Sequence, residues 1–128
     1  MPGIDLGTLD TAALCDKGAE LELTHPVTGE PLGARITLAG VDSRLWRRAV
    51  AAVADRRGKR GGRPTAESAR ADGIEILARC TLGWSGMALD GKELPCTEEN
   101  ARLVYGRFPW LREQVDTFCS DRASYLRD

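Results

Sequence analysis

Apolar and polar residues first fall into a regular pattern in residues 19–25. There, apolar side chains recur at every second position, which is the period of a β-strand with one buried face. Pro26 ends this strand because proline has no backbone N–H to donate, and the turn residues 28–31 follow. Residues 32–41 then return as a second strand. The pattern predicts an N-terminal β-hairpin that lies against helices, because a hairpin alone is only marginally stable.

The period then changes from two residues to three or four. Asp42 and Ser43 are good helix caps, and one apolar face follows, made of Leu45, Trp46, Ala49, Val50 and Val53. Thr65 caps a second helix, with one side made of Ala69, Gly73, Ile76, Leu77 and Cys80. Gly73 costs about 1 kcal/mol relative to alanine, unless a neighbouring helix approaches closely there. We expect residues 58–64, rich in glycine and basic side chains, to form a flexible loop.

Two further helices are predicted near the C-terminus. Thr97 caps the first, Gly106 is a stop signal, and the apolar positions between them are Ala101, Val104 and Tyr105. Pro109 suits the first turn of the second helix, whose apolar stripe is Leu111, Val115, Phe118, Cys119 and Leu126. Only a short linker separates the two, so we expect a C-terminal helical hairpin.

Two weaker patterns complete the expected fold. Residues 84–94, centred on the turn pair Asp90-Gly91, suggest a second small hairpin or an extended connector, and residues 11–15 suggest a short helical turn capped by Asp10. The fold class is therefore α+β, with a β-hairpin followed by about four mainly short helices. A chain of 128 residues with 42% apolar side chains fits one domain, residues 1–128.

Charge is distributed unevenly along the chain. The net charge is −1, which argues against general binding to nucleic acid or to a membrane surface. Residues 1–43 nevertheless carry −5, and residues 44–63 carry +7. The basic segment is a candidate docking element for an acidic partner, although a solvated loop is the simpler interpretation.

Few residues have side chains and spacing suited to catalysis or metal binding. The four cysteines form no CxxC pair and the single histidine cannot complete a zinc site with them, so we expect no metal, no cofactor and reduced thiols. His25 and Cys15 have no partner in sequence that would make either a catalyst, and we interpret both as structural. We expect no enzymatic activity. No apolar run is long enough to span a bilayer, and nothing at the N-terminus resembles a secretory signal.

Short motifs follow one another in order along the C-terminal part of the chain. They are Asp90-Gly91, Leu94-Pro95-Cys96-Thr97, Glu99-Asn100-Ala101-Arg102-Leu103, Phe108-Pro109-Trp110-Leu111, Gln114-Val115-Asp116 and Asp121-Arg122-Ala123. In this order they resemble the C-terminal part of tail assembly chaperones from long-tailed, siphovirus-like bacteriophages and prophages. The likeness extends upstream through residues 24–29, 42–43 and 82–84. Cys96 departs from the family, which typically has a larger apolar residue there.

The resemblance implies a function and its partners. Such chaperones hold the long helical tape measure protein until tail tube protein polymerises around it, in the host bacterial cytoplasm, and they are absent from the mature virion. We expect the partner to contact an apolar surface on the last hairpin, at Phe108, Trp110, Leu111 and Phe118, and a basic one at Arg57, Arg60 and Arg63. The alternatives are a virion structural subunit of the tail and a small nucleic-acid-binding regulator. A homo-oligomer is also left open.

Overall fold

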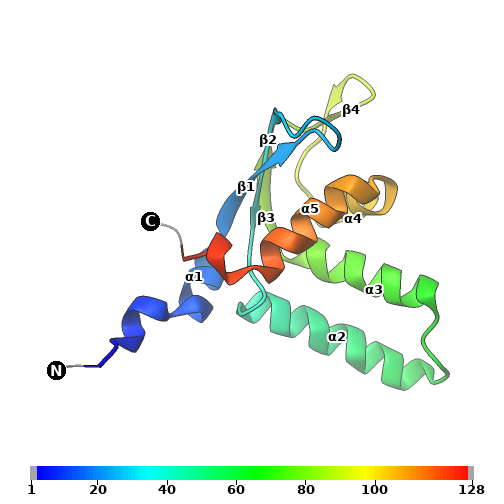
Figure 1. Ribbon diagram of the computed structural model, residues 1–128. Helices are drawn as coiled ribbons and strands as arrows, with labels where there is room; N and C mark the ends of the chain where they lie inside the picture. The colour runs from blue at the N-terminus through cyan, green and yellow to red at the C-terminus, as the bar shows by residue number, and fades with distance from the viewer. Residues whose placement is uncertain (1–2, 127–128) are drawn as a thin grey trace.

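Residues 3–126 form a three-stranded antiparallel sheet, a small two-stranded hairpin and five α-helices. The computed structural model describes residues 3–126 (Figure 1). In chain order the elements are η1 (Leu6–Leu9), α1 (Thr11–Lys17), β1 (Ala19–Thr24), β2 (Pro31–Leu38), α2 (Arg44–Arg60), α3 (Ala66–Arg79), β3 (Thr81–Ser85), β4 (Ala88–Leu89), β5 (Lys92–Glu93), α4 (Glu98–Arg107), α5 (Pro109–Ser120) and η2 (Arg122–Ser124). The α+β class and the N-terminal hairpin are confirmed.

The predicted hairpin is two strands of a larger sheet. The strand order is β1–β2–β3, with Leu21 opposite Ile36 and Ile36 opposite Trp84. The third strand was not predicted, because β3 has only five residues, contains Gly83 and follows α3 with Cys80 alone between them. A strand this short has too few positions to show the alternation of apolar and polar side chains that identifies a strand in sequence. On the buried face of the sheet the apolar side chains pack into the core, among them Leu23, Ile36 and Leu38.

The helix caps predicted from the sequence are confirmed. The side chains of Asp10, Ser43, Thr65 and Thr97 each accept a hydrogen bond from a backbone N–H in the first turn that follows. These bonds satisfy donors that have no partner inside the helix. Of the two candidate caps before α2, Ser43 is the one used.

The C-terminal helices α4 and α5 are confirmed, with only Phe108 between them. Gly106 does not end α4, which continues through Arg107. Leu126 lies outside the α5 stripe: Asp121 adopts an extended conformation (φ −99°, ψ 110°) that ends the helix, and Leu126 is 37% exposed. The apolar stripe of α5 therefore stops at Cys119.

Buried side chains from α3, α4 and α5 meet the sheet in one core. Tyr105 on α4 is fully buried, and its hydroxyl lies 2.7 Å from Thr81 Oγ1 at the start of β3. The Thr81 hydroxyl donates to the carbonyl of Leu77, so the tyrosine hydroxyl is the donor in the first bond. Burial raises the pKa of Tyr105 well above its usual range. The phenol therefore stays neutral and ties α4 to the junction of α3 and β3.

The second hairpin predicted around Asp90-Gly91 is present as β4 and β5, with Leu89 opposite Lys92. Asp90 has φ 52° and Gly91 has φ 82°. Two successive residues with positive φ are what the tight turns of two-residue hairpins require, and Asp-Gly is a preferred pair for them.

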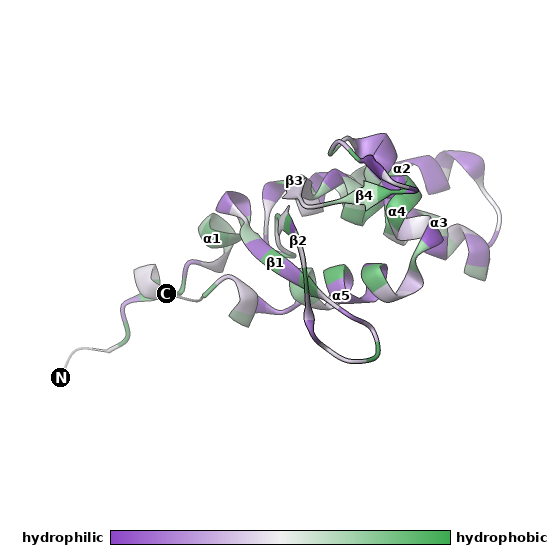
Figure 2. Ribbon diagram, turned by 90° about the horizontal axis from the view of Figure 1, so that it is seen from above, coloured by the Kyte–Doolittle hydropathy of each residue, from purple (hydrophilic) through white to green (hydrophobic). Residues whose placement is uncertain are grey.

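The helices α2 and α3 project from the sheet as a pair joined by a short turn (Figure 1). The expected loop at residues 58–64 is too long: Gly58, Lys59 and Arg60 belong to α2, and the connection begins at Gly61. The helix continues through these residues because ion pairs to α3 stabilise its preceding turn. It ends where the Gly61 N–H (φ 72°) donates a hydrogen bond to the Arg57 carbonyl. Both helix ends at this turn are hydrophilic (Figure 2).

Residues 121–126, which follow α5, bond to the end of β2 and to the connection between β2 and α2, and we call them the C-terminal latch. Arg122 makes two hydrogen bonds to the Asp42 carboxylate, at 2.7 and 2.9 Å. The Tyr125 hydroxyl donates to the carbonyl of Leu38 at 3.2 Å. The Arg122 hydrogen bond holds the pKa of Asp42 below its usual value. The latch thus joins residues that follow α5 to residues 38–42, far earlier in the chain.

Candidate partner-binding surfaces

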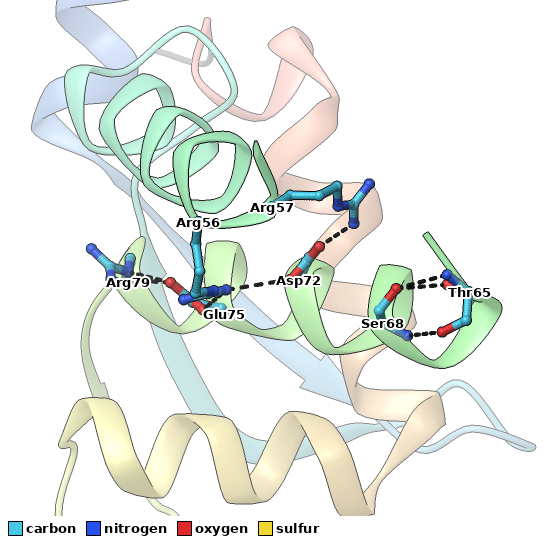
Figure 3. Close-up of polar contacts among 7 residues, drawn as sticks. All are labelled: Arg56, Arg57, Thr65, Ser68, Asp72, Glu75 and Arg79. Carbon is cyan, nitrogen blue, oxygen red and sulfur yellow. Dashed lines mark hydrogen bonds and ion pairs between the residues drawn. The ribbon is translucent and has the colours of Figure 1, made fainter. Parts of the chain in front are cut away.

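A group of arginines and carboxylates holds α2 against α3 (Figure 3). Arg56 on α2 reaches Glu75 at 2.7 Å and Asp72 at 3.4 Å, while Arg79 reaches Glu75 at 3.0 Å. Glu75 is only 4% exposed, and the Arg56 hydrogen bond lowers its pKa despite burial. Arg57 pairs with Asp72 beside it. This cluster neutralises two of the cations of α2, Arg56 and Arg57.

The three arginines proposed for docking are gathered at the turn between α2 and α3. Arg57, Arg60 and Arg63 line one cavity of about 110 Å³ together with the turn residues Gly61 and Gly62. Arg57 forms an ion pair with Asp72, whereas Arg60 and Arg63 are exposed and form no ion pair with any of residues 3–126. Only these last two are free to meet an acidic partner.

An apolar groove runs along the same helix pair, and the sequence analysis did not predict it. Its volume is about 710 Å³, and we call it the α2–α3 groove; its lining is Val50, Val53, Ala54, Arg57, Gly58, Gly61, Gly62, Ala69, Asp72, Gly73 and Ile76. Val50 is 42% exposed in it. The missed signal is the combination of Val50 on the apolar face of α2 with small residues facing it on α3.

Gly73 has a different role from the one expected. A close approach by another helix would explain a glycine in mid-helix, but a Cβ added at Gly73 would meet no atom within 4 Å. The missing side chain instead leaves the groove open.

Replacing Gly73 by alanine should therefore stabilise the protein. Alanine is favoured over glycine by about 1 kcal/mol inside a helix, and nothing here opposes the added methyl group. The midpoint of urea unfolding should rise with an unchanged slope. A fall in the midpoint would show that the backbone at Gly73 is not an ordinary helical position, and Ala69→Gly, on the same face, should shift the midpoint the opposite way.

The proposed apolar surface on the last hairpin is only partly available. Leu111 is 4% exposed and Phe118 is 7% exposed, so both pack in the core and offer little surface to a partner. The Phe118 ring packs edge-on against Tyr125, with ring centroids 5.6 Å apart. Phe108 and Trp110 are half-buried against the core, and Arg107 lies over the Phe108 ring. An apolar helical stripe looks the same in sequence whether it meets the core or a partner.

His25 and Cys15, the two residues considered as catalysts, both have structural roles in the fold. The His25 ring nitrogen Nδ1 accepts hydrogen bonds from the backbone N–H groups of Val27 and Thr28, which stabilises the turn after β1. Cys15 is fully buried, and burial raises its pKa. Burial also raises the pKa of Cys80 and Cys119 to about 12, so these thiols stay protonated. Among residues 3–126, no three side chains are placed to hold a metal ion.

Comparisons with known proteins give no further guide. No family model, curated protein or solved structure matches the chain. Within residues 3–126, none of the helices has both the length and the apolar character needed to cross a membrane. The case for a function therefore rests on the motif order and on the surfaces described above.

Proposed function

We propose that the protein is a non-enzymatic tail assembly chaperone of a long-tailed bacteriophage or prophage. In this proposal it binds the tape measure protein in the host cytoplasm, assists assembly of the tail tube around it, and leaves before the virion is complete. The ordered motifs from Asp90-Gly91 to Asp121-Arg122-Ala123 support the family. The α2–α3 groove is the observation that supports binding to a helical partner.

The groove suits one apolar stripe of an amphipathic helix. Val50 and Ile76 present apolar surface, while Gly58 and Gly73 have open space where side chains would otherwise stand. Small residues let the backbones of two helices approach closely, which increases van der Waals contact. Tape measure proteins are long and helical, so they offer such stripes repeatedly.

The turn between α2 and α3 adds positive charge at the end of the α2–α3 groove. Arg60 and Arg63 lie at the end of the helix pair and can pair with acidic side chains beside the apolar stripe of a partner. Arg56 and Arg57 are held by Glu75 and Asp72, so fewer cations remain for nucleic acid than the sequence offers. This favours a protein partner over the regulator alternative.

Capture of the tape measure protein by matched variants tests the proposal. Val50→Asp places a charge in the groove and should reduce capture about tenfold or more, as loss of a central contact does. Leu103→Asp is the control, because Leu103 is 44% exposed on α4 and lines none of the grooves described here. Lysate from cells making the neighbouring tail genes supplies the partner, and mass spectrometry identifies it.

The outcomes separate the alternatives. Capture of the tape measure protein by wild type and Leu103→Asp but not by Val50→Asp, with the chain absent from purified virions, supports the chaperone. A stoichiometric presence in virions indicates a structural subunit of the tail. Equal capture by both variants, with folding intact, removes the α2–α3 groove as the binding surface. Retention of nucleic acid that declines steeply with salt indicates the regulator.

A further inference from the structure

The edge strand of the sheet carries an unusual side-chain contact. β1 lies at one edge, with β2 as its only strand neighbour in residues 3–126, and α5 passes beside it. The Gln114 carboxamide of α5 accepts a hydrogen bond from the Thr24 N–H at 3.0 Å and donates one to the Thr24 carbonyl at 2.9 Å. An antiparallel strand makes this same pair of bonds to one residue of its neighbour. Gln114 thus stands where the next strand of the sheet would begin.

The rest of the same edge is open. Backbone groups of a strand point alternately to either side, and the His25 N–H points toward the second arm of the hairpin, where it donates to Glu30 at 2.8 Å. Thr24 therefore points outward. The register between β1 and β2 is irregular between Glu22 and Thr24, but the extra residues lie on β2, between Pro31 and Arg35, so the alternation along β1 continues and Glu22 and Glu20 also point outward. No side chain or loop among residues 3–126 bonds to the outward backbone groups of these two glutamates. Such groups are a template for another strand.

A groove of about 510 Å³ lies beside this edge. β1 supplies Leu21 and Glu22 to it, and α5 supplies Trp110, Glu113 and Phe118. Asp121 adds a further carboxylate, and among residues 3–126 no lysine or arginine lines the groove. On the outer face of the sheet, Glu20 and Glu22 both pair with Arg35, at 3.4 and 3.7 Å, and with no other cation of residues 3–126. Both faces beside the edge are therefore acidic.

We propose that β1 receives a fourth strand from a partner protein, an extended segment in which basic and apolar residues alternate. Its backbone pairs with Glu20 and Glu22 in line with the Gln114 carboxamide. Its apolar side chains face Leu21 and Trp110, and its basic side chains face the glutamates of the outer face. A second copy of this chain does not fit, because two β1 edges would bring Glu20 and Glu22 against like charges. The proposal is independent of the chaperone function.

A synthetic peptide, acetyl-Lys-Val-Lys-Val-Lys-Val-amide, is the probe. Its binding to ¹⁵N-labelled protein is followed by NMR. Glu22→Pro removes the outward N–H and leaves the bonds to β2, since proline is tolerated where an edge-strand N–H faces outward. Glu22→Ala is the matched control, which loses the charge and keeps the N–H. We expect Glu22→Pro to bind about tenfold more weakly than Glu22→Ala, the effect of losing one hydrogen bond and the strand geometry around it.

A second measurement uses the wild-type protein, so that it does not depend on the folding of a variant. Saturating peptide should slow amide hydrogen exchange at Glu20 and Glu22 and leave Leu21 unchanged, because Leu21 lies opposite Ile36 and its N–H points toward β2. Equal affinities of folded Glu22→Pro and Glu22→Ala, unaltered exchange at Glu20 and Glu22, or absence of binding at millimolar peptide would each overturn the proposal. A dimer of the free protein that Glu22→Pro dissociates would overturn the choice of partner.

Discussion

Replacing Gly40 by alanine should destabilise the protein by about 3 kcal/mol, at the upper end of the cost of overpacking a core. A Cβ at Gly40 would fall 2.6 Å from Tyr125 Cε2 and closer still to Cys15 Sγ. Cys15 is fully buried, and Tyr125 is held by its bond to Leu38, so neither side chain can withdraw easily. Urea unfolding followed by circular dichroism measures the change as a lower midpoint.

Gly83→Ala is the control for this prediction. Gly83 also lies in the sheet region, in β3, but a Cβ there meets no atom within 4 Å. Its substitution should change the free energy of unfolding by no more than about 0.5 kcal/mol, as at other sites with no packing conflict. If Gly40→Ala and Gly83→Ala unfold at the same urea concentration, the contact between the C-terminal latch and Cys15 is looser than the structure shows.

Replacing Glu75 by glutamine should cost about 2 kcal/mol of stability near neutral pH, less than for a fully buried pair because Arg56 and Arg79 remain partly in water. The pKa of Glu75 is lowered in the folded protein, chiefly by the Arg56 hydrogen bond. The contribution is therefore fully present above the unfolded pKa of about 4.3, and it is lost as the pH falls through the lower folded pKa. Urea unfolding from pH 7 downward should show the two proteins converging in acid.

Asp55→Asn separates this effect from a general response to lost charge. Asp55 lies on α2 and pairs with Lys59 at 3.4 Å, but both side chains are well exposed. Its loss should change stability by less than about 1 kcal/mol. Asp42 also has a lowered pKa, so it is the difference between wild type and Glu75→Gln, not the wild-type curve alone, that reports on Glu75. A difference that does not shrink below about pH 4 would refute the assigned role of Arg56.

Short-range signals in the sequence predicted where most helices begin. Contacts between distant segments decided the length of α2 and the presence of β3. Ser43, Thr65 and Thr97 act within one helical turn, so their roles could be inferred from a few neighbouring residues. The length of α2 depends instead on Arg57 meeting Asp72 across the helix pair. β3 could be recognised only through its pairing with β2, since five residues carry too little pattern of their own.

The partner-binding surfaces could likewise be predicted only in part, because they too depend on contacts between distant residues. Leu111 and Phe118 have the spacing of an apolar face, but spacing does not say whether the core or a partner covers that face. Arg57, Arg60 and Arg63 were predicted together as a basic docking surface; Arg60 and Arg63 are exposed, whereas Arg57 is paired. The α2–α3 groove and the Gln114–Thr24 contact join residues whose proximity follows from the fold alone.

The C-terminal latch also bears on the order in which the chain can fold during synthesis. Its bonds join residues 80 and 87 positions apart, Arg122 to Asp42 and Tyr125 to Leu38. The β1–β2 hairpin and α1 leave the ribosome long before the residues that fasten them, and contacts so distant in sequence form slowly. A nascent chain that ends at α4 therefore exposes Cys15 and the buried face of the hairpin. Protection of these surfaces is completed only once residues 121–126 have been synthesised.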